Sequence, residues 1–95
     1  MLLAVLSLVP AAATAERTLM VFGDSLSAAY NLSTAQGWVH ILGERIERSH
    51  LPWRVVNASV SGETTAGGLR RLAEDLKRHK PSVVLIELGA NDALR

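Results

Sequence analysis

The sequence contains no cysteine, few aromatic residues and almost no net charge. The lack of cysteine and the low charge each exclude a class of structure or partner. Without cysteine no disulfide can form, even in an oxidising compartment. A formal net charge of +1 argues against nucleic acid or an acidic membrane surface as the main partner. The three histidines are not paired at metal-ligand spacing, so we expect no metal site. No apolar run approaches the roughly 20 residues that a membrane-spanning helix needs, so we expect no stable span.

The amino terminus carries the pattern of a secretory signal peptide. An apolar run from Leu2 to Val9 is followed by small residues and then by Ala13-Thr14-Ala15, an A-x-A cleavage pattern. A signal peptide usually has a positively charged residue before its apolar run, and here no Lys or Arg precedes it. We interpret residues 1–15 as a signal peptide and expect an exported protein, periplasmic or secreted, that keeps residues 16–95. The alternative for the same run is a buried hydrophobic strand.

The rest of the chain alternates between strand and helix patterns. Parallel strands need crossover connections, so this alternation predicts an α/β fold with right-handed crossovers. We expect a flavodoxin-like, doubly wound parallel sheet in three layers, of which about three strands and two helices are present. We therefore expect residues 16–95 to be the N-terminal part of a truncated domain. The predicted strands are 18–22, 54–58 and 83–88, and the predicted helices are 36–49 and about 65–80.

The second predicted helix has the clearest pattern. Thr64 or Thr65 can cap its start, and Pro81 stops it. Positive residues crowd its last turn, where they suit the helix dipole. Its apolar positions recur at i, i+3, i+4 and i+7, which predicts a stripe facing the core. The stripe consists of Leu69, Leu72, Ala73 and Leu76.

Polar loops follow all three predicted strands, at the edge where an open α/β sheet binds its ligands. The first loop holds Asp24 and Ser25, the second Gly62, and the third Asn91 and Asp92. Ser25 can supply an attacking oxygen, Gly62 a closely approachable backbone N–H, and Asn91 a side-chain N–H₂. A hydroxyl beside two such donors can perform acyl transfer, because the tetrahedral oxyanion needs aimed donors.

Three segments resemble the first three sequence blocks of the SGNH, or GDSL, hydrolase family. They are Gly23-Asp24-Ser25-Leu26-Ser27, Ser61-Gly62-Glu63-Thr64 and Gly89-Ala90-Asn91-Asp92. Longer phrases at 56–59 and 87–95 are similar to one branch of that family, the exported bacterial thioesterases, lysophospholipases and arylesterases. The resemblance covers residues 18–95.

The resemblance implies a role for each of these residues. Ser25 would be the nucleophile, and its own N–H, the N–H of Gly62 and the side chain of Asn91 would form the oxyanion hole. Asp24 would shape the nucleophile turn, and Asp92 would support the third loop. The expected substrate is a small acyl ester or thioester, hydrolysed without a cofactor by an enzyme that is monomeric when complete.

The family takes its general base and its acid from a later Asp-x-x-His block, and these 95 residues contain none. His40, His50 and His79 fall in or beside the predicted helices, where surface or capping roles are expected. Without a base the serine hydroxyl stays protonated near neutral pH. We therefore expect the chain by itself to be inactive or nearly so.

Other interpretations remain open for the same residues. Asp24 and Asp92 could form a metal site, although turn and cap hydrogen bonds are the ordinary task of such residues. The whole chain could be a non-catalytic α/β binding module or a degenerate remnant. It could also be a nucleotide-binding half-domain, but no glycine fingerprint follows the first strand.

Overall fold

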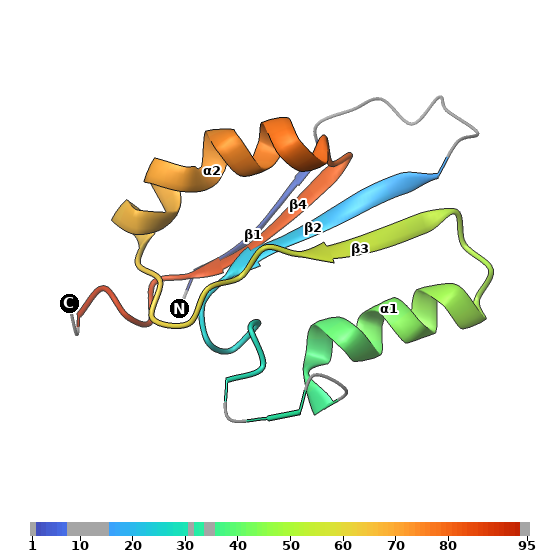
Figure 1. Ribbon diagram of the computed structural model, residues 1–95, viewed down its shortest axis with the longest axis horizontal. Helices are drawn as coiled ribbons and strands as arrows, with labels where there is room; N and C mark the ends of the chain where they lie inside the picture. Colours follow the sequence, from blue (N-terminus) through green and yellow to red (C-terminus); the bar gives the residue numbers. More distant parts are fainter. Residues whose placement is uncertain (1, 8–15, 31, 34–35, 94–95) are drawn as a thin grey trace.

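A four-stranded sheet with one helix on each face forms the part of the chain that the structure describes (Figure 1). The computed structural model describes residues 2–7, 16–30, 32–33 and 36–93. The proposed cleavage site at Ala13-Thr14-Ala15 lies outside these residues. The strands are β1 (Leu2–Ser7), β2 (Arg17–Gly23), β3 (Trp53–Asn57) and β4 (Val83–Leu88), and the helices are α1 (Trp38–Arg48) and α2 (Thr65–His79).

The sheet order is β1-β4-β2-β3. Strand β2 pairs in parallel with both β3 and β4, which confirms the three predicted parallel strands and their α/β arrangement. Strand β1 adds a fourth, antiparallel strand beside β4, so the sheet is mixed rather than wholly parallel. In β1, Leu3 is 57% exposed and Val5 is 62% exposed. The N-terminal run is therefore paired but largely uncovered, and its role as a signal peptide stays a prediction.

The hydrophobic core lies between the sheet and α2. Leu72 and Leu76 of the helix pack against it, as predicted. Leu69 and Ala73 were predicted to face the core, but Leu69 is 75% exposed and Ala73 is exposed as well. The prediction is wrong there because Gly68, without a side chain, occupies the buried position. The buried residues of this core are Met20, Phe22, Val84 and Leu88.

Gly68 sets how closely α2 can approach the sheet. A Cβ built on Gly68 would lie 2.9 Å from Leu88 Cδ1 and 3.1 Å from Phe22 Cε2. Gly43 of α1 is the control position, because a Cβ built there would lie 4.0 Å from Val55 Cβ, an ordinary contact distance. Both glycines are helical, so alanine should improve helix propensity at each, and the difference between them isolates packing.

Gly68→Ala should therefore destabilise the protein by about 1–3 kcal/mol, since overpacking a core forces neighbours to move. Gly43→Ala should stabilise it by roughly 0.5–1 kcal/mol through the backbone entropy that alanine saves. Urea unfolding of the two variants beside the parent measures both changes. Equal effects of the two substitutions would contradict the close packing of α2.

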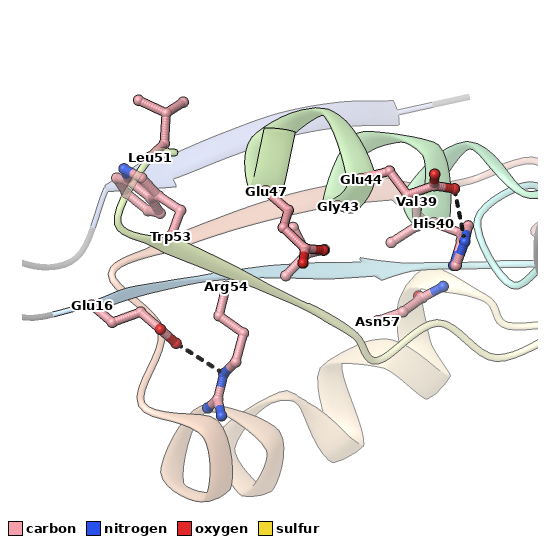
Figure 2. Close-up of a pocket in the computed structure, with 11 residues that line it drawn as sticks. Glu16, Val39, His40, Gly43, Glu44, Glu47, Leu51, Trp53, Arg54 and Asn57 are labelled. Atoms are coloured by element: carbon pink, nitrogen blue, oxygen red, sulfur yellow. Dashed lines mark ion pairs between the residues drawn. The ribbon is translucent and has the colours of Figure 1, made fainter. Parts of the chain in front are cut away.

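Helix α1 covers the other face of the sheet and buries Val39. It ends at Arg48, with Ser49 as its C-cap, a little before Pro52. An open groove of about 630 Å³ lies between α1 and β3 (Figure 2). Ion pairs join Glu16 to Arg54 and the His40 ring to a glutamate on the same helix along this groove. Among the described residues, neither helix has the length and apolar character needed to cross a membrane.

Candidate active site

Ser25 lies in a turn over residues 24–30, directly after β2, which we call the Ser25 turn. The main-chain N–H groups of Ser27 and Ala28 both donate to the carbonyl oxygen of Asp24, at 3.1 and 2.9 Å. Asp24 Oδ1 accepts the N–H of Leu26 at 3.0 Å. Asp24 is fully buried and Ser25 is half-buried. These bonds fix the main chain on both sides of Ser25 and leave its side chain at the surface of the turn.

Residues 58–64, the Gly62 loop, follow β3 and lie against the end of β2, just before the Ser25 turn. The N–H of Ala58 donates to Val21 O at 2.7 Å, and the N–H of Val60 donates to Gly23 O at 3.0 Å. In return, the N–H of Gly23 donates to Ser59 Oγ at 3.1 Å. Gly62 has a φ of 81°, in the left-handed region that favours glycine. The loop turns sharply at that residue.

Residues 89–93, the Asn91 loop, follow β4 and are tied to the Gly62 loop. Asn91 Nδ2 donates to Glu63 O at 3.0 Å, which orients the amide and leaves its second N–H available. Asp92 Oδ1 accepts the N–H of Thr65 at 2.9 Å, and its Oδ2 accepts the Thr65 hydroxyl at 2.6 Å. Both Thr65 donors lower the pKa of Asp92. The loop is thereby fixed to the start of α2.

The three loops that the sequence places after three separate strands thus form one hydrogen-bonded group. Gly23, the last residue of β2 before the Ser25 turn, bonds Val60 and Ser59 of the Gly62 loop, and Glu63 of that loop bonds Asn91. A further bond, from Asn57 Nδ2 to Ser27 O at 2.8 Å, holds the far side of the Ser25 turn. Asn91 makes one of these contacts itself, and Ser25 and Gly62 each lie one or two residues from another.

Arg71 of α2 is a residue that the sequence analysis missed. Its Nε donates to Glu63 Oε2 at 2.6 Å, and its Nη1 donates to Ala58 O at 2.8 Å. Its guanidinium also lies 4.2 Å from the centre of the Phe22 ring. Burial raises the pKa of Glu63, but the hydrogen bonds from Arg71 and the Thr64 N–H, with the charges of Arg71 and Arg70, together hold that pKa below its ordinary value. Arg71 fastens both ends of the Gly62 loop, and only the folded chain brings these residues together.

Glu87 of β4 is the second missed residue. It is 4% exposed, and its Oε1 accepts the Ser27 hydroxyl at 2.8 Å. Burial raises the pKa of Glu87, and contact with Asp24 raises it further. The sequence did hold a signal here, because an acid inside the apolar run Val83–Leu88 needs an explanation.

The histidines stand where the sequence predicts surface and helix-end roles. His40, in the first turn of α1, pairs with Glu44 at 2.9 Å in the groove of Figure 2. His79 lies in the last turn of α2, and His50 follows α1. Asp24 and Asp92 make the turn and cap bonds described above. Within the described ranges, no three His, Cys, Asp or Glu side chains are grouped as a metal site.

Three parallel strands that end in loops carrying a serine, a glycine and an asparagine, with the last two loops hydrogen-bonded to each other, are an arrangement typical of hydrolases with an α/β fold. The chain belongs to the GDSL-like lipase/acylhydrolase family, whose model matches residues 21–95. This confirms the family that the three motifs indicated.

Curated relatives and solved structures agree with that assignment. "Esterase TesA" of Pseudomonas aeruginosa is 56% identical over 81 residues, which cover 85% of this chain and 40% of the relative. "Thioesterase 1/protease 1/lysophospholipase L1" of Escherichia coli K12 is 47% identical over 83 residues, 87% of this chain and 38% of the relative. The psychrotrophic esterase EstA from Pseudoalteromonas, solved with monoethylphosphonate as inhibitor, superposes with a TM-score of 0.78 at 48% identity, over 84% of this chain and 44% of that one. The chain spans about two fifths of the length of these proteins.

Proposed function

We propose that the protein is an exported serine esterase or thioesterase that hydrolyses small acyl esters or thioesters, with lysophospholipase- and arylesterase-like substrates. The observation that carries this proposal is the hydrogen-bonded assembly of the Ser25 turn, the Gly62 loop and the Asn91 loop at one edge of the sheet. The names of the relatives, esterase and thioesterase/lysophospholipase, support the same class of reaction.

In the proposed mechanism Ser25 Oγ attacks the carbonyl carbon of the substrate and gives up its proton to a general base. The carbonyl oxygen becomes an oxyanion that accepts hydrogen bonds from the N–H of Ser25, the N–H of Gly62 and Nδ2 of Asn91. The alcohol or thiol then leaves with the proton, and an acyl-Ser25 ester remains. Water hydrolyses that ester to the free acid and restores Ser25.

The base in this mechanism is not assigned to any residue of the sequence. No Asp-x-x-His block occurs in the 95 residues, and His40 is already paired with Glu44. A serine hydroxyl without a base is a weak nucleophile near neutral pH. We therefore expect residues 16–95 alone to show at most a residual reaction.

Covalent labelling tests the nucleophile. An alkyl phosphonate ester should form a phosphonyl adduct on Ser25 in protein expressed from the full reading frame, because phosphorus is attacked by the activated hydroxyl as a carbonyl carbon is. Mass spectrometry of the intact protein and of its peptides locates the adduct. Residues 16–95 alone should label far more slowly, since the base is missing.

Labelling to the same extent in Ser25→Ala and in the parent would reject Ser25 as the nucleophile. A second candidate is a non-catalytic α/β binding module. That candidate predicts an ester that binds without hydrolysis and no adduct from either form of the protein. The same experiment therefore separates the two functions.

A further inference from the structure

Glu87 is an acid placed inside strand β4 to which the mechanism above gives no task. Its side chain faces the same side of the sheet as Gly23 and stands opposite Leu3 of β1. Leu3, Leu26 and Trp38 line an apolar cavity of about 390 Å³ together with Glu87 itself. A carboxylate buried in such surroundings costs several kcal/mol unless it is paired or neutralised.

The contacts of Glu87 leave one of its oxygens without a donor. Oε1 accepts the Ser27 hydroxyl at 2.8 Å. Oε2 is buried and receives no hydrogen bond from any described residue, and the same holds for Asp24 Oδ2. Glu87 is the register partner of Gly23, the residue before Asp24, and Ser27 bonds both Glu87 Oε1 and the Asp24 carbonyl oxygen, so the two acids are neighbours, and Asp24 raises the pKa of Glu87. Two buried carboxyl oxygens without a donor thus belong to two neighbouring acids.

No cation neutralises this pair within the part of the chain that the structure describes. The groups facing Glu87 are Leu3 from β1, Gly23 from β2, Trp38 from α1, and Asp24 and Ser27 from the Ser25 turn. Asp24 is the titratable group among them. Two ionised carboxylates in contact at a site of low dielectric repel strongly, and a single shared proton removes the repulsion.

We propose that Glu87 is a positioning residue that carries this proton on Oε2 and donates it to Asp24 Oδ2, while its Oε1 accepts the Ser27 hydroxyl. One neutral carboxyl group then holds both Asp24 and Ser27, the residues that flank Ser25 and Leu26. The main-chain bonds from Ser27 and Ala28 to Asp24 O complete a closed turn. We call the contacts of Glu87 with Asp24 and Ser27 the Glu87 clamp. The direction in which Ser25 presents its Oγ and its N–H depends on this clamp.

The clamp has a definite dependence on pH. Burial raises the pKa of Glu87 above its ordinary value of 4.5, and Asp24 raises it further, against the lowering effect of the Ser27 hydroxyl. A raised pKa means that the folded protein holds a proton that the unfolded chain has released. The stabilisation is therefore fully present below about pH 4.5 and is lost as the pH rises through the pKa of folded Glu87.

The first measurement is independent of activity. With ¹³C-labelled glutamate side chains, NMR titration of the protein from its full reading frame should show the Glu87 carboxyl titrating above the other glutamates. Glu87→Gln identifies its resonance, and Asp24→Asn should shift its titration downward, because the neighbouring charge is gone. An ordinary titration of Glu87 in the parent would overturn the shared proton.

The second measurement uses stability. Glu87→Gln keeps both contacts, because its amide oxygen accepts from Ser27 and its N–H₂ donates to Asp24. Its free energy of unfolding in urea should therefore lack the decline that the parent shows above pH 4.5. Glu74→Gln, on an exposed face of α2, is the matched control and should keep the parental decline. Identical pH profiles of Glu87→Gln and the parent would overturn the proposal.

The kinetic consequence rests on the proposed role of Ser25. Glu87→Ala should lower kcat by about 100-fold with KM little changed, since misplacing a reacting group by about 1 Å costs that much. Glu87→Gln should restore kcat and extend activity to higher pH. If Glu87→Ala does not fold, the NMR titration of Glu87 and the pH profile of Glu87→Gln stability still decide whether Glu87 carries the shared proton. A raised Glu87 titration without phosphonate labelling of Ser25 would reject the proposed function and leave the shared proton standing.

Discussion

Ser25→Ala should reduce kcat for p-nitrophenyl ester hydrolysis by on the order of a millionfold, to the level that binding and the oxyanion donors alone can supply. The reason is chemical, because without the hydroxyl no acyl-enzyme forms and water must attack the substrate directly. KM should change little, since the side chain lost is small and half-buried. Steady-state hydrolysis by protein from the full reading frame measures both constants.

Ser33→Ala is the control for this experiment, because Ser33 is an exposed serine in the same connection between β2 and α1. Its backbone N–H donates to Gln36 Oε1, and its side chain is the only part that the substitution changes. It should leave both constants unchanged. Equal rates for Ser25→Ala and the parent would refute the nucleophile assignment. Unchanged melting of Ser25→Ala establishes that lost activity is not lost folding.

Asn91→Ala should reduce kcat by about 100- to 1000-fold, the usual cost of one oxyanion donor. In the structure the bond to Glu63 O, at 3.0 Å, holds the Asn91 amide in one orientation before any substrate arrives. A donor that needs no reorganisation contributes most when charge develops on the carbonyl oxygen. The loss should therefore fall on kcat rather than on KM.

Ala90→Ser, an exposed change beside Asn91, is the matched control and should be neutral. Asn91→Gln sharpens the experiment, because the longer side chain keeps the amide but moves its N–H away from the fixed position. It should lose most of the rate that Asn91→Ala loses. If Asn91→Gln is as active as the parent, the aimed geometry of the amide is not what matters.

Local patterns were sufficient to predict most of the framework. The strand at 83–88 agrees with β4 residue for residue, and Thr64 caps α2 by accepting the N–H of Gly67 at 3.1 Å. Such elements depend on side-chain periodicity and on capping groups within a few residues, which the sequence states directly. The ends of α1 moved by one or two residues, as helix ends do.

The sequence was least informative where tertiary packing outweighs the local spacing of apolar residues. Leu69 has the right spacing for the core stripe, but the close approach of α2 at Gly68 rotates it out to solvent. For residues 2–7 the sequence offered a strand only as the alternative to a signal peptide, and it could not indicate the antiparallel pairing with β4. Register and partner choice in a sheet depend on residues far away in sequence.

The sequence by itself determined the family, the alternation of strand and helix, and the three motifs that carry Ser25, Gly62 and Asn91. Each of these is a local property, written in neighbouring residues. Only the tertiary structure decided that β4 lies beside β2, because strand order is fixed by burial and pairing across the whole sheet. That placement brings Glu87 beneath Asp24 and Ser27, and it joins Asn91 to the Gly62 loop through Glu63.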